Sequence, residues 1–219
     1  MEHRPLDADP TPSPLATPVD GRWRRRLAWM RRVASQWMRR QLGLPVVIDT
    51  ADRQVLEGTI LPHYANRADV QRVLFVGTRW YTQAYEARFA HAYYATLDID
   101  PQAARYGSRQ HHVTASASEA DRHFEPNSFD LIVFNGVFGW GLNARDDVEA
   151  AVRAFARLLR AGGELVVGWN DVPRYRPFPF SEVLALQALQ PLYFAPLHTQ
   201  VLQLETDNRH RFEFFRKPG

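Results

Sequence analysis

The chain has 219 residues, of which 45% are hydrophobic and 23% charged, and its formal net charge is +3. These values are typical of a globular protein and exclude a wholly disordered or collagen-like chain. It contains no cysteine, which excludes disulfides, thiolate metal sites and a cysteine nucleophile. No apolar run reaches the roughly 18 residues of a transmembrane helix, and arginines interrupt the first apolar stretch, so we expect neither a membrane span nor a secretory signal.

The charge is distributed unevenly along the chain. All but one of the 27 basic residues are arginine, and residues 1–48 carry nine arginines against four acids. Residues 1–20 also contain five of the fifteen prolines. Such a stretch buries too little apolar surface to order itself, so we expect a disordered, proline-rich arm there.

The segment 21–44 is predicted to form a basic amphipathic helix. Within residues 22–42, apolar side chains recur at the three- and four-residue spacings of one helix face, and most arginines lie elsewhere. Three interpretations stay open. The helix packs on its own domain, which we favour, or lies on an anionic membrane surface, where Trp and Arg suit the interface, or neutralises the phosphates of a nucleic acid.

Residues 45–219 alternate between short apolar runs and helical patterns. The apolar runs are Val73–Val76, Tyr94–Leu97, Leu131–Phe134 and Leu165–Val167. Runs of this length that end at turn residues are typical of strands buried on both faces of a parallel sheet. The predicted helices are one from Thr82 to Phe89, one over Ala144–Arg160 capped by Asn143, and one over Glu182–Gln190 capped by Ser181.

The C-terminal tail breaks this alternation. Two strand-like runs, His198–Thr206 and Arg209–Arg216, are joined around the turn pair Asp207-Asn208. The predicted fold class is therefore α/β, with a doubly wound, mostly parallel sheet, a C-terminal antiparallel hairpin and the amphipathic helix in front.

In such sheets the ligand lies at the carboxyl ends of the strands. Gly77 begins the turn after the first strand, and Asp98 follows the second strand 21 residues later. An acid at about this spacing is the usual group that grips ribose hydroxyls, because a carboxylate accepts both hydroxyl protons. The spacing and the strand context together predict a nucleoside-binding site.

Four segments resemble the class I S-adenosylmethionine-dependent methyltransferases: RVLFVGT, ATLDIDP, PNSFDLIVFNGV and RLLRAGGELVVGWND. The resemblance covers about residues 70–219 and includes the C-terminal hairpin. It implies S-adenosylmethionine as cofactor, with Gly77 beside its methionine part, Asp98 on its ribose and Asn135 near the reacting methyl. The cofactor-binding residues expected from it are Gly77, Thr78, Arg79, Trp80, Asp98, Ile99, Asn135 and Gly136.

The first turn departs from the family pattern of Gly-x-Gly-x-Gly. Only Gly77 is present, and Thr78, Arg79, Trp80 and Tyr81 occupy the rest of the turn. Two outcomes stay open. Arg79 pairs with the cofactor carboxylate while Trp80 or Tyr81 faces the sulfonium, or these side chains fill the volume and the cofactor site is lost.

Other reaction classes lack their motifs. The chain has no Gly-x-Gly-x-x-Gly for nicotinamide or flavin, no phosphate P-loop and no Gly-x-Ser-x-Gly nucleophile elbow. The eight histidines lack metal-ligand spacing, so no metal is expected.

The segment 135–143 follows a buried strand and contains three glycines around Phe138 and Trp140, so we expect it to line the pocket. The catalytic candidates are Asn135, Asp171 and Tyr81. His63 and Tyr64 are further guesses for a general base.

We therefore expect methyl transfer from S-adenosylmethionine to a small-molecule acceptor, without a choice between O, N and C. The alternative is a non-catalytic, methyltransferase-like binding or scaffold protein. In one variant of this alternative, the Arg/Trp-rich helix associates it with a membrane surface. Nucleic acid is the less favoured partner. The expected location is the cytoplasm, with a peripheral position at the inner membrane surface as the variant.

Overall fold

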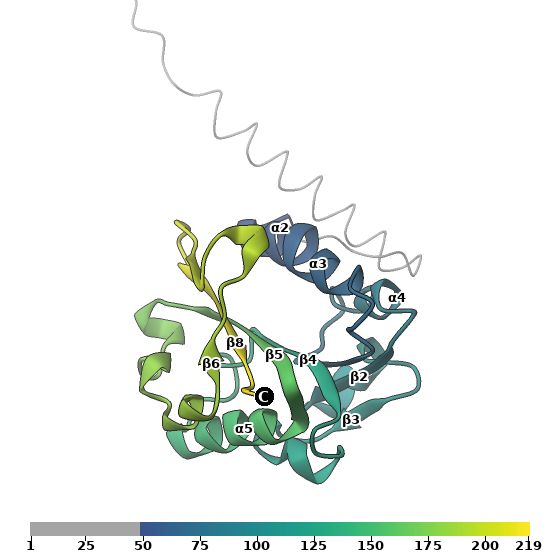
Figure 1. Ribbon diagram of the computed structural model, residues 1–219. Coiled ribbons are helices and arrows are strands. Elements are labelled where there is room, and N and C mark those ends of the chain that lie inside the picture. The colour runs from purple at the N-terminus through teal and green to yellow at the C-terminus, as the bar shows by residue number, and fades with distance from the viewer. Residues whose placement is uncertain (1–48) are drawn as a thin grey trace, which may run out of the picture. The chain divides into compact units, whose positions relative to one another are not determined.

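The computed structural model describes residues 49–219. The predicted arm (1–20) and the predicted amphipathic helix (21–44) lie outside the described residues. The described part is built around one eight-stranded sheet with the order β3-β2-β1-β4-β5-β8-β6, and β7 also pairs with β8 (Figure 1). The strands are β1 (Arg72–Val76), β2 (Tyr93–Asp98), β3 (His112–Thr114), β4 (Phe129–Asn135), β5 (Leu159–Asn170), β6 (Gln190–Pro191), β7 (Val201–Gln203) and β8 (His210–Arg216).

The first five strands are parallel to one another, and β8 runs antiparallel to β5 and to its other partners, β6 and β7. β1 lies between β2 and β4, and β8 pairs with β5 in the antiparallel direction. The predicted doubly wound sheet with a C-terminal antiparallel hairpin is thereby confirmed. Since β1 and β4 are neighbours with a change of winding direction, their carboxyl ends mark the position where such sheets bind ligands.

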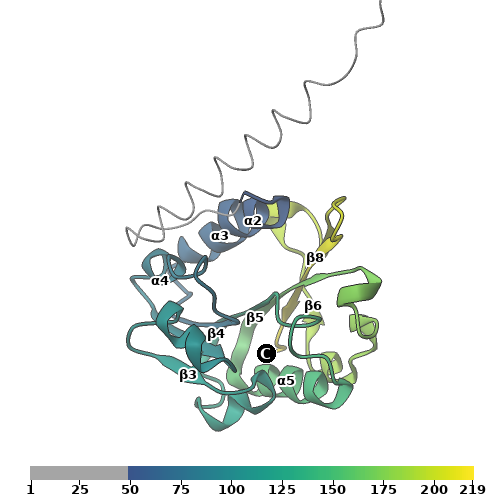
Figure 2. The same cartoon turned by 180° about the vertical axis from the view of Figure 1, so that it is seen from behind.

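Helices cover both faces of the sheet (Figure 2). One face carries α2 (Ala51–Val55), which continues through a π-helical turn, η1 (Leu56–Ile60), into α3 (Leu61–Ala65), and beside it the short α4 (Tyr85–Arg88). The other face carries α5 (Arg145–Leu158). The remaining helical turns are 3-10: η2 (Pro101–Tyr106), η3 (Ala117–Arg122), η4 (Pro173–Tyr175), η5 (Phe180–Glu182), η6 (Leu184–Ala188) and η7 (Ala195–Leu197).

Alternate residues of the strands enter two apolar layers. In β1, Leu74 and Val76 pack with α5, and Val73 and Phe75 pack with the α2–α3 side. This alternation explains why the strand sequence is apolar throughout, because both faces of the strand are buried. Burial of this kind at about 25 cal/mol per Å² is the main force that holds the sheet between its helices.

Several predicted helix boundaries were wrong. The helix expected after Thr82 is only the four-residue α4, because the Thr82 hydroxyl accepts from the Arg79 N–H (3.0 Å) within the preceding turn. The N-cap of α5 is Ala144 rather than Asn143, and it makes no side-chain cap bond. The segment after Ser181 forms 3-10 turns instead of one helix.

Within residues 49–219, no helix combines the length and the apolar character that crossing a membrane requires.

Candidate active site

A cavity of about 470 Å³ opens at the carboxyl ends of the parallel strands. This is within the usual range for small-molecule sites. The ends of β1, β2 and β4 contribute Gly77, Asp98 and Asn135 to its wall. Segments far apart in sequence close it: the start of α2, the loop 136–142 and the start of β8.

The turn after β1 depends on Gly77. Its φ is +90°, and a Cβ there would lie 2.5 Å from Cγ2 of Val137. The Gly77 N–H donates to the Leu97 carbonyl (2.8 Å), which ties the turn to the end of β2. A residue without a side chain is therefore needed at this position both for backbone conformation and for space.

Asp98 is buried at the end of β2 and is already engaged with the turn. Its Oδ2 accepts from the Thr78 N–H (2.7 Å) and from Arg79 Nη1 (3.2 Å), and its Oδ1 accepts from the Asp100 N–H (2.8 Å). A carboxylate has about four acceptor positions. One position thus stays open in the present arrangement, and a second would open if Arg79 moved.

Three polar side chains form a row at the floor of the cavity, which we call the amide–imidazole row: Asn135, His210 and Asn170. His210 Nδ1 lies 2.7 Å from Asn170 Oδ1, and His210 Nε2 lies 3.2 Å from Asn135 Oδ1. Burial lowers the pKa of His210 to about 4, so the imidazole is neutral near neutral pH.

Gly168 makes room for this row. A Cβ at Gly168 would lie 1.8 Å from Asn135 Oδ1 and 3.0 Å from His210 Nε2. Sequence reasoning missed His210 because it lies on the C-terminal strand, far from every motif. Its place opposite Asn170, the last residue of β5, follows from the antiparallel pairing of β8 with β5, and no local sequence pattern gives that register.

The roof of the cavity comes from α2 and the turn after β1. Thr50, Asp52 and Arg53 line it. Arg53 Nη1 donates to the Tyr85 hydroxyl (2.8 Å), and its guanidinium lies 4.2 Å from the ring centroid of Tyr81. Arg53 therefore joins α2 to the turn and to α4.

Trp140 lines the cavity from the loop 136–142. Its ring stacks on Tyr175 with centroids 4.2 Å apart, and it is 56% exposed. The loop approaches Tyr175 closely because Gly139 has no side chain: a Cβ there would lie 1.8 Å from the Tyr175 carbonyl oxygen.

Seven of the ten candidate residues line the cavity. They are Gly77, Arg79, Tyr81, Asp98, Ile99, Asn135 and Gly136. The other three, Thr78, Trp80 and Asp171, do not line it. The Thr78 side chain is buried and donates to the Ala103 carbonyl (3.2 Å), although its backbone N–H supports Asp98. Trp80 lies edge-on to Tyr81.

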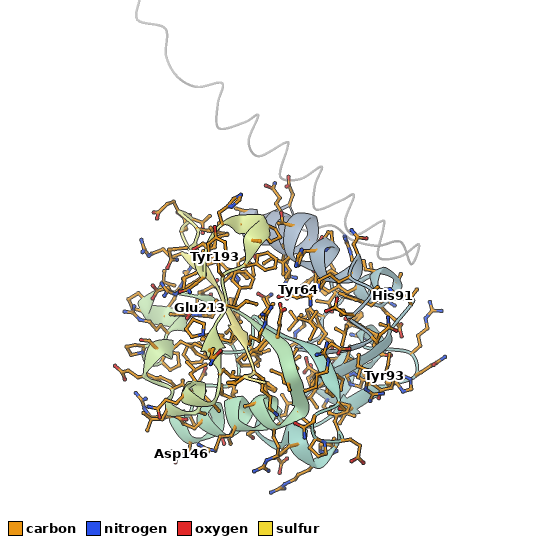
Figure 3. The ribbon with its side chains drawn as sticks, viewed as in Figure 1. Tyr64, His91, Tyr93, Asp146, Tyr193 and Glu213 are labelled. Atoms are coloured by element: carbon orange, nitrogen blue, oxygen red, sulfur yellow. The ribbon has the colours of Figure 1, made fainter. Side chains whose placement is uncertain are left out.

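The candidate bases also lie outside the cavity wall. Asp171 pairs with Arg176 at 2.6 Å, so its carboxylate is directed to that guanidinium. Tyr64 belongs to α3 (Figure 3), and its hydroxyl donates to Glu164 (2.8 Å). His63 packs against Phe194. The structure therefore gives no support to these three as a general base.

The sequence and the fold were compared with those of known proteins. A family model described as a methyltransferase domain matches residues 75–167, which include the carboxyl ends of β1, β2 and β4 and most of β5. The chain contains a class I S-adenosylmethionine-dependent methyltransferase domain.

Solved structures share the fold of this methyltransferase domain. The N-methyltransferase NodS from Bradyrhizobium japonicum WM9 has a TM-score of 0.58 at 18% identity, over 78% of this chain and 100% of that chain. A 1,6-didemethyltoxoflavin-N1-methyltransferase from Burkholderia thailandensis has 0.56 at 19%, over 99% of both chains. A TehB-like methyltransferase from Corynebacterium glutamicum has 0.54 at 19%, over 75% and 93%. The comparison with curated proteins found no match.

The methyltransferase domain keeps an open cavity despite its unusual first turn. Arg79 and Tyr81 line the cavity wall without filling the space between Gly77, Asp98 and Asn135. Arg79 is paired with Asp98 and lies 4.0 Å from Asp100. The scaffold alternative required the side chains of the first turn to fill this volume, and they do not.

After β3, the cavity wall of the methyltransferase domain contains backbone groups and one serine side chain but no carboxylate. Ala115, Ser116 and Ala117 line the cavity, whereas Glu119 and Asp121 pair with Arg122 and Arg157. Among the described residues, no group of three or more His, Asp or Glu side chains is placed to hold a metal ion.

Proposed function

We propose that the domain transfers a methyl group from S-adenosylmethionine to a small-molecule acceptor. The observation that carries this proposal is the convergence of Gly77, Asp98 and Asn135 on one cavity of about 470 Å³ at the carboxyl ends of β1, β2 and β4. The enzyme class follows from the family, and the acceptor class is the new part of the proposal.

The residues at the cavity fit this cofactor. Asp98 would accept the ribose hydroxyl protons, because it keeps an open acceptor position and lies at the end of β2. Gly77 would leave room for the methionine part, and the exposed Ile99 side chain offers an apolar surface beyond the ribose. When bound, the cofactor supplies a methyl group on a positively charged sulfur, which needs no further activation.

The protein's own contribution is then mainly to place the acceptor. Holding two reactants in line can supply up to about 7–11 kcal/mol of barrier reduction. Asn135 and His210 lie at the floor, Arg53 and Tyr81 at the roof and Trp140 at the side of the same cavity. The acceptor is thus surrounded by groups that can orient it and exclude water.

The lining of the cavity favours a small acceptor over a macromolecule. Its lining comes from α2, the turn after β1, the loop 136–142 and β8, which surround it from several sides. A space of this size holds the cofactor with a compact acceptor. An RNA acceptor would require a base to enter the same cavity, at the energetic cost of unstacking it.

A labelling experiment tests this proposal. The full chain is incubated with S-adenosyl[methyl-³H]methionine and a cell extract separated into ultrafiltrate, RNA and protein fractions. We expect tritium to be transferred in the ultrafiltrate. Transfer only to RNA or only to protein would contradict a small-molecule acceptor, and an Asp98→Asn variant gives the background.

A further inference from the structure

The amide–imidazole row contains more polar groups than cofactor binding requires. Asn135, His210 and Asn170 come from β4, β8 and β5 and are all buried, and all three line the cavity. Gly168 provides the space in which Asn135 and His210 meet. A glycine in the interior of a buried strand weakens the strand, so close approach of neighbouring side chains is the reason for its presence here.

A neutral imidazole orders the two amides on either side of it. Burial lowers the pKa of His210 to about 4. A neutral ring donates from one nitrogen and accepts at the other. Because both neighbours are carboxamides, one must turn its oxygen to the ring and the other its NH2. The oxygen and nitrogen of a carboxamide have nearly the same shape, so either amide can turn.

The distances favour one of the two arrangements. The contact between His210 Nδ1 and Asn170 is the shorter, 2.7 Å against 3.2 Å for His210 Nε2 and Asn135. With Nδ1–H donating to the Asn170 oxygen, Nε2 accepts from the Asn135 NH2 group once the Asn135 carboxamide is turned to exchange its NH2 with the Oδ1 that lies 3.2 Å from Nε2. The Asn135 oxygen then faces the cavity. In the opposite arrangement an NH2 group would face the acceptor and would engage the lone pair needed for attack.

We propose that His210 is a positioning residue that turns the Asn135 oxygen toward the cavity, and that the methyl acceptor is a nitrogen nucleophile with an N–H bond. This proposal rests on the proposed methyl-transfer function. The Asn135 oxygen accepts the N–H and leaves the nitrogen lone pair free. In the transfer, that lone pair forms the new N–C bond, the S–C electron pair stays on sulfur, and the surplus proton of the ammonium product passes to water.

The acids of the cavity agree with an amine rather than an alcohol. Of the carboxylates that line it, Asp98 is bonded to the Thr78 N–H and Arg79, and Asp52 lies 3.9 Å from Arg53. An alcohol needs a base to remove its proton during attack. A neutral amine has both an N–H and a free lone pair and needs only alignment, which the amide–imidazole row supplies.

The test combines activity, binding and a tautomer measurement. Amines with aliphatic, benzylic and heteroaromatic skeletons are offered beside the alcohols of the same skeletons, with S-adenosyl[methyl-³H]methionine. We expect methylation of amines only. Asn135→Ala should lower kcat for the best amine by roughly 100-fold and His210→Ala by roughly 30-fold, magnitudes typical of lost positioning groups. The Kd for S-adenosylhomocysteine should stay within about twofold in His210→Ala.

The ¹⁵N chemical shifts of the His210 ring nitrogens report which nitrogen carries the proton. A merely structural role of His210 would not require one particular tautomer. The shifts should show His210 as the Nδ1–H tautomer, with the resonance identified by its loss in His210→Ala. His91→Gln is the matched control, since His91 is exposed at the edge of the molecule (Figure 3).

The failures of the two proposals are distinguishable. If the wild-type chain binds S-adenosylhomocysteine but methylates alcohols and no amine, the inference is wrong and the proposed function stands. An Nε2–H tautomer, or unchanged kcat in both variants, also overturns the inference. If the folded wild-type chain binds no S-adenosylhomocysteine, the proposed function fails and the inference fails with it.

Discussion

Arg79 Nη1 lies 3.2 Å from Oδ2 of Asp98, so the residue that stands in place of a family glycine is paired with the carboxylate expected to hold ribose. The Arg79 side chain is half exposed, and the Asp98 side chain is almost fully buried. The arginine therefore lies over the carboxylate from the cavity side without sealing it. Under the proposed function, the ribose hydroxyls and Arg79 would compete for Oδ2 of Asp98.

Removal of the competing cation should strengthen cofactor binding. We expect Arg79→Met to lower the Kd for S-adenosylhomocysteine by about two- to fivefold, because an exposed ion pair contributes up to about 1 kcal/mol. Asp98→Asn should raise the Kd at least about tenfold. Calorimetric titration of both variants checks this. A weaker complex with Arg79→Met would mean that Arg79 grips the ligand instead.

The first turn should tolerate no side chain at residue 77. Gly77→Ala should lower the free energy of unfolding by about 2 kcal/mol, because the positive φ is strained for alanine and the new Cβ would meet Val137. Gly58→Ala is the matched control, since nothing lies within 4 Å of its added Cβ, and we expect no loss there. Urea unfolding measures both variants.

A second variant separates the two causes at Gly77. When Val137 is already alanine, Gly77→Ala should cost less unfolding free energy than it does in the wild-type chain, because the steric clash is removed. The part that remains is the backbone strain at residue 77. Full recovery would contradict a contribution from backbone strain.

A buried carboxylate joins α3 to the sheet far from the cavity. Glu164 accepts from Tyr64 (2.8 Å), Arg67 (3.0 Å) and Arg216 (2.9 Å). Burial acts to raise the pKa of Glu164, but these hydrogen bonds outweigh it and hold the pKa below its usual value of 4.5. A carboxyl with a lowered folded pKa stabilises the protein above its unfolded pKa, and this contribution is lost as the pH falls through the folded pKa.

Glu164→Gln should therefore destabilise the protein mainly at neutral pH. We expect a loss of about 2 kcal/mol there, because two arginines lose their anionic partner. The difference from wild type should shrink below about pH 4. Urea unfolding over a pH series measures it. A difference independent of pH would show that the charge of Glu164 is not what stabilises the cluster.

Trp140 should affect acceptor binding more than stability. Its ring is half exposed and stacks on Tyr175 at the cavity, so Trp140→Ala should cost less than about 1.5 kcal/mol of unfolding free energy. The KM for the acceptor should rise roughly tenfold while the Kd for S-adenosylhomocysteine stays unchanged. Tyr193→Ala, another exposed aromatic residue (Figure 3), is the control and should change neither. An unchanged KM would remove Trp140 from the acceptor site.

The sequence predicted the features that depend on local pattern. Four apolar runs became β1, β2, β4 and β5 because burial on both faces leaves an uninterrupted apolar signal. Asp98 and Asn135 reached the cavity because they directly follow or end such runs, and the carboxyl ends of parallel strands meet at one edge.

The features that depend on long-range partners were not predictable in the same way. His210 reaches Asn135 only through the pairing of β8 with β5 in one register, and no local pattern fixes that register. Asp171 was a reasonable candidate at a strand end, but Arg176 folds back onto it. Whether Arg79 pairs with a ligand or with Asp98 likewise depends on which charged groups the fold brings close to its guanidinium.

The most direct test of the account is calorimetric titration of the full chain with S-adenosylhomocysteine. We expect saturable binding at one site, an upward shift of the melting temperature by mass action, loss of affinity in Asp98→Asn and no change in His91→Gln. Absence of both heat and a melting shift at millimolar ligand, in a protein shown to be folded, would contradict a functional cofactor site between Gly77, Asp98 and Asn135.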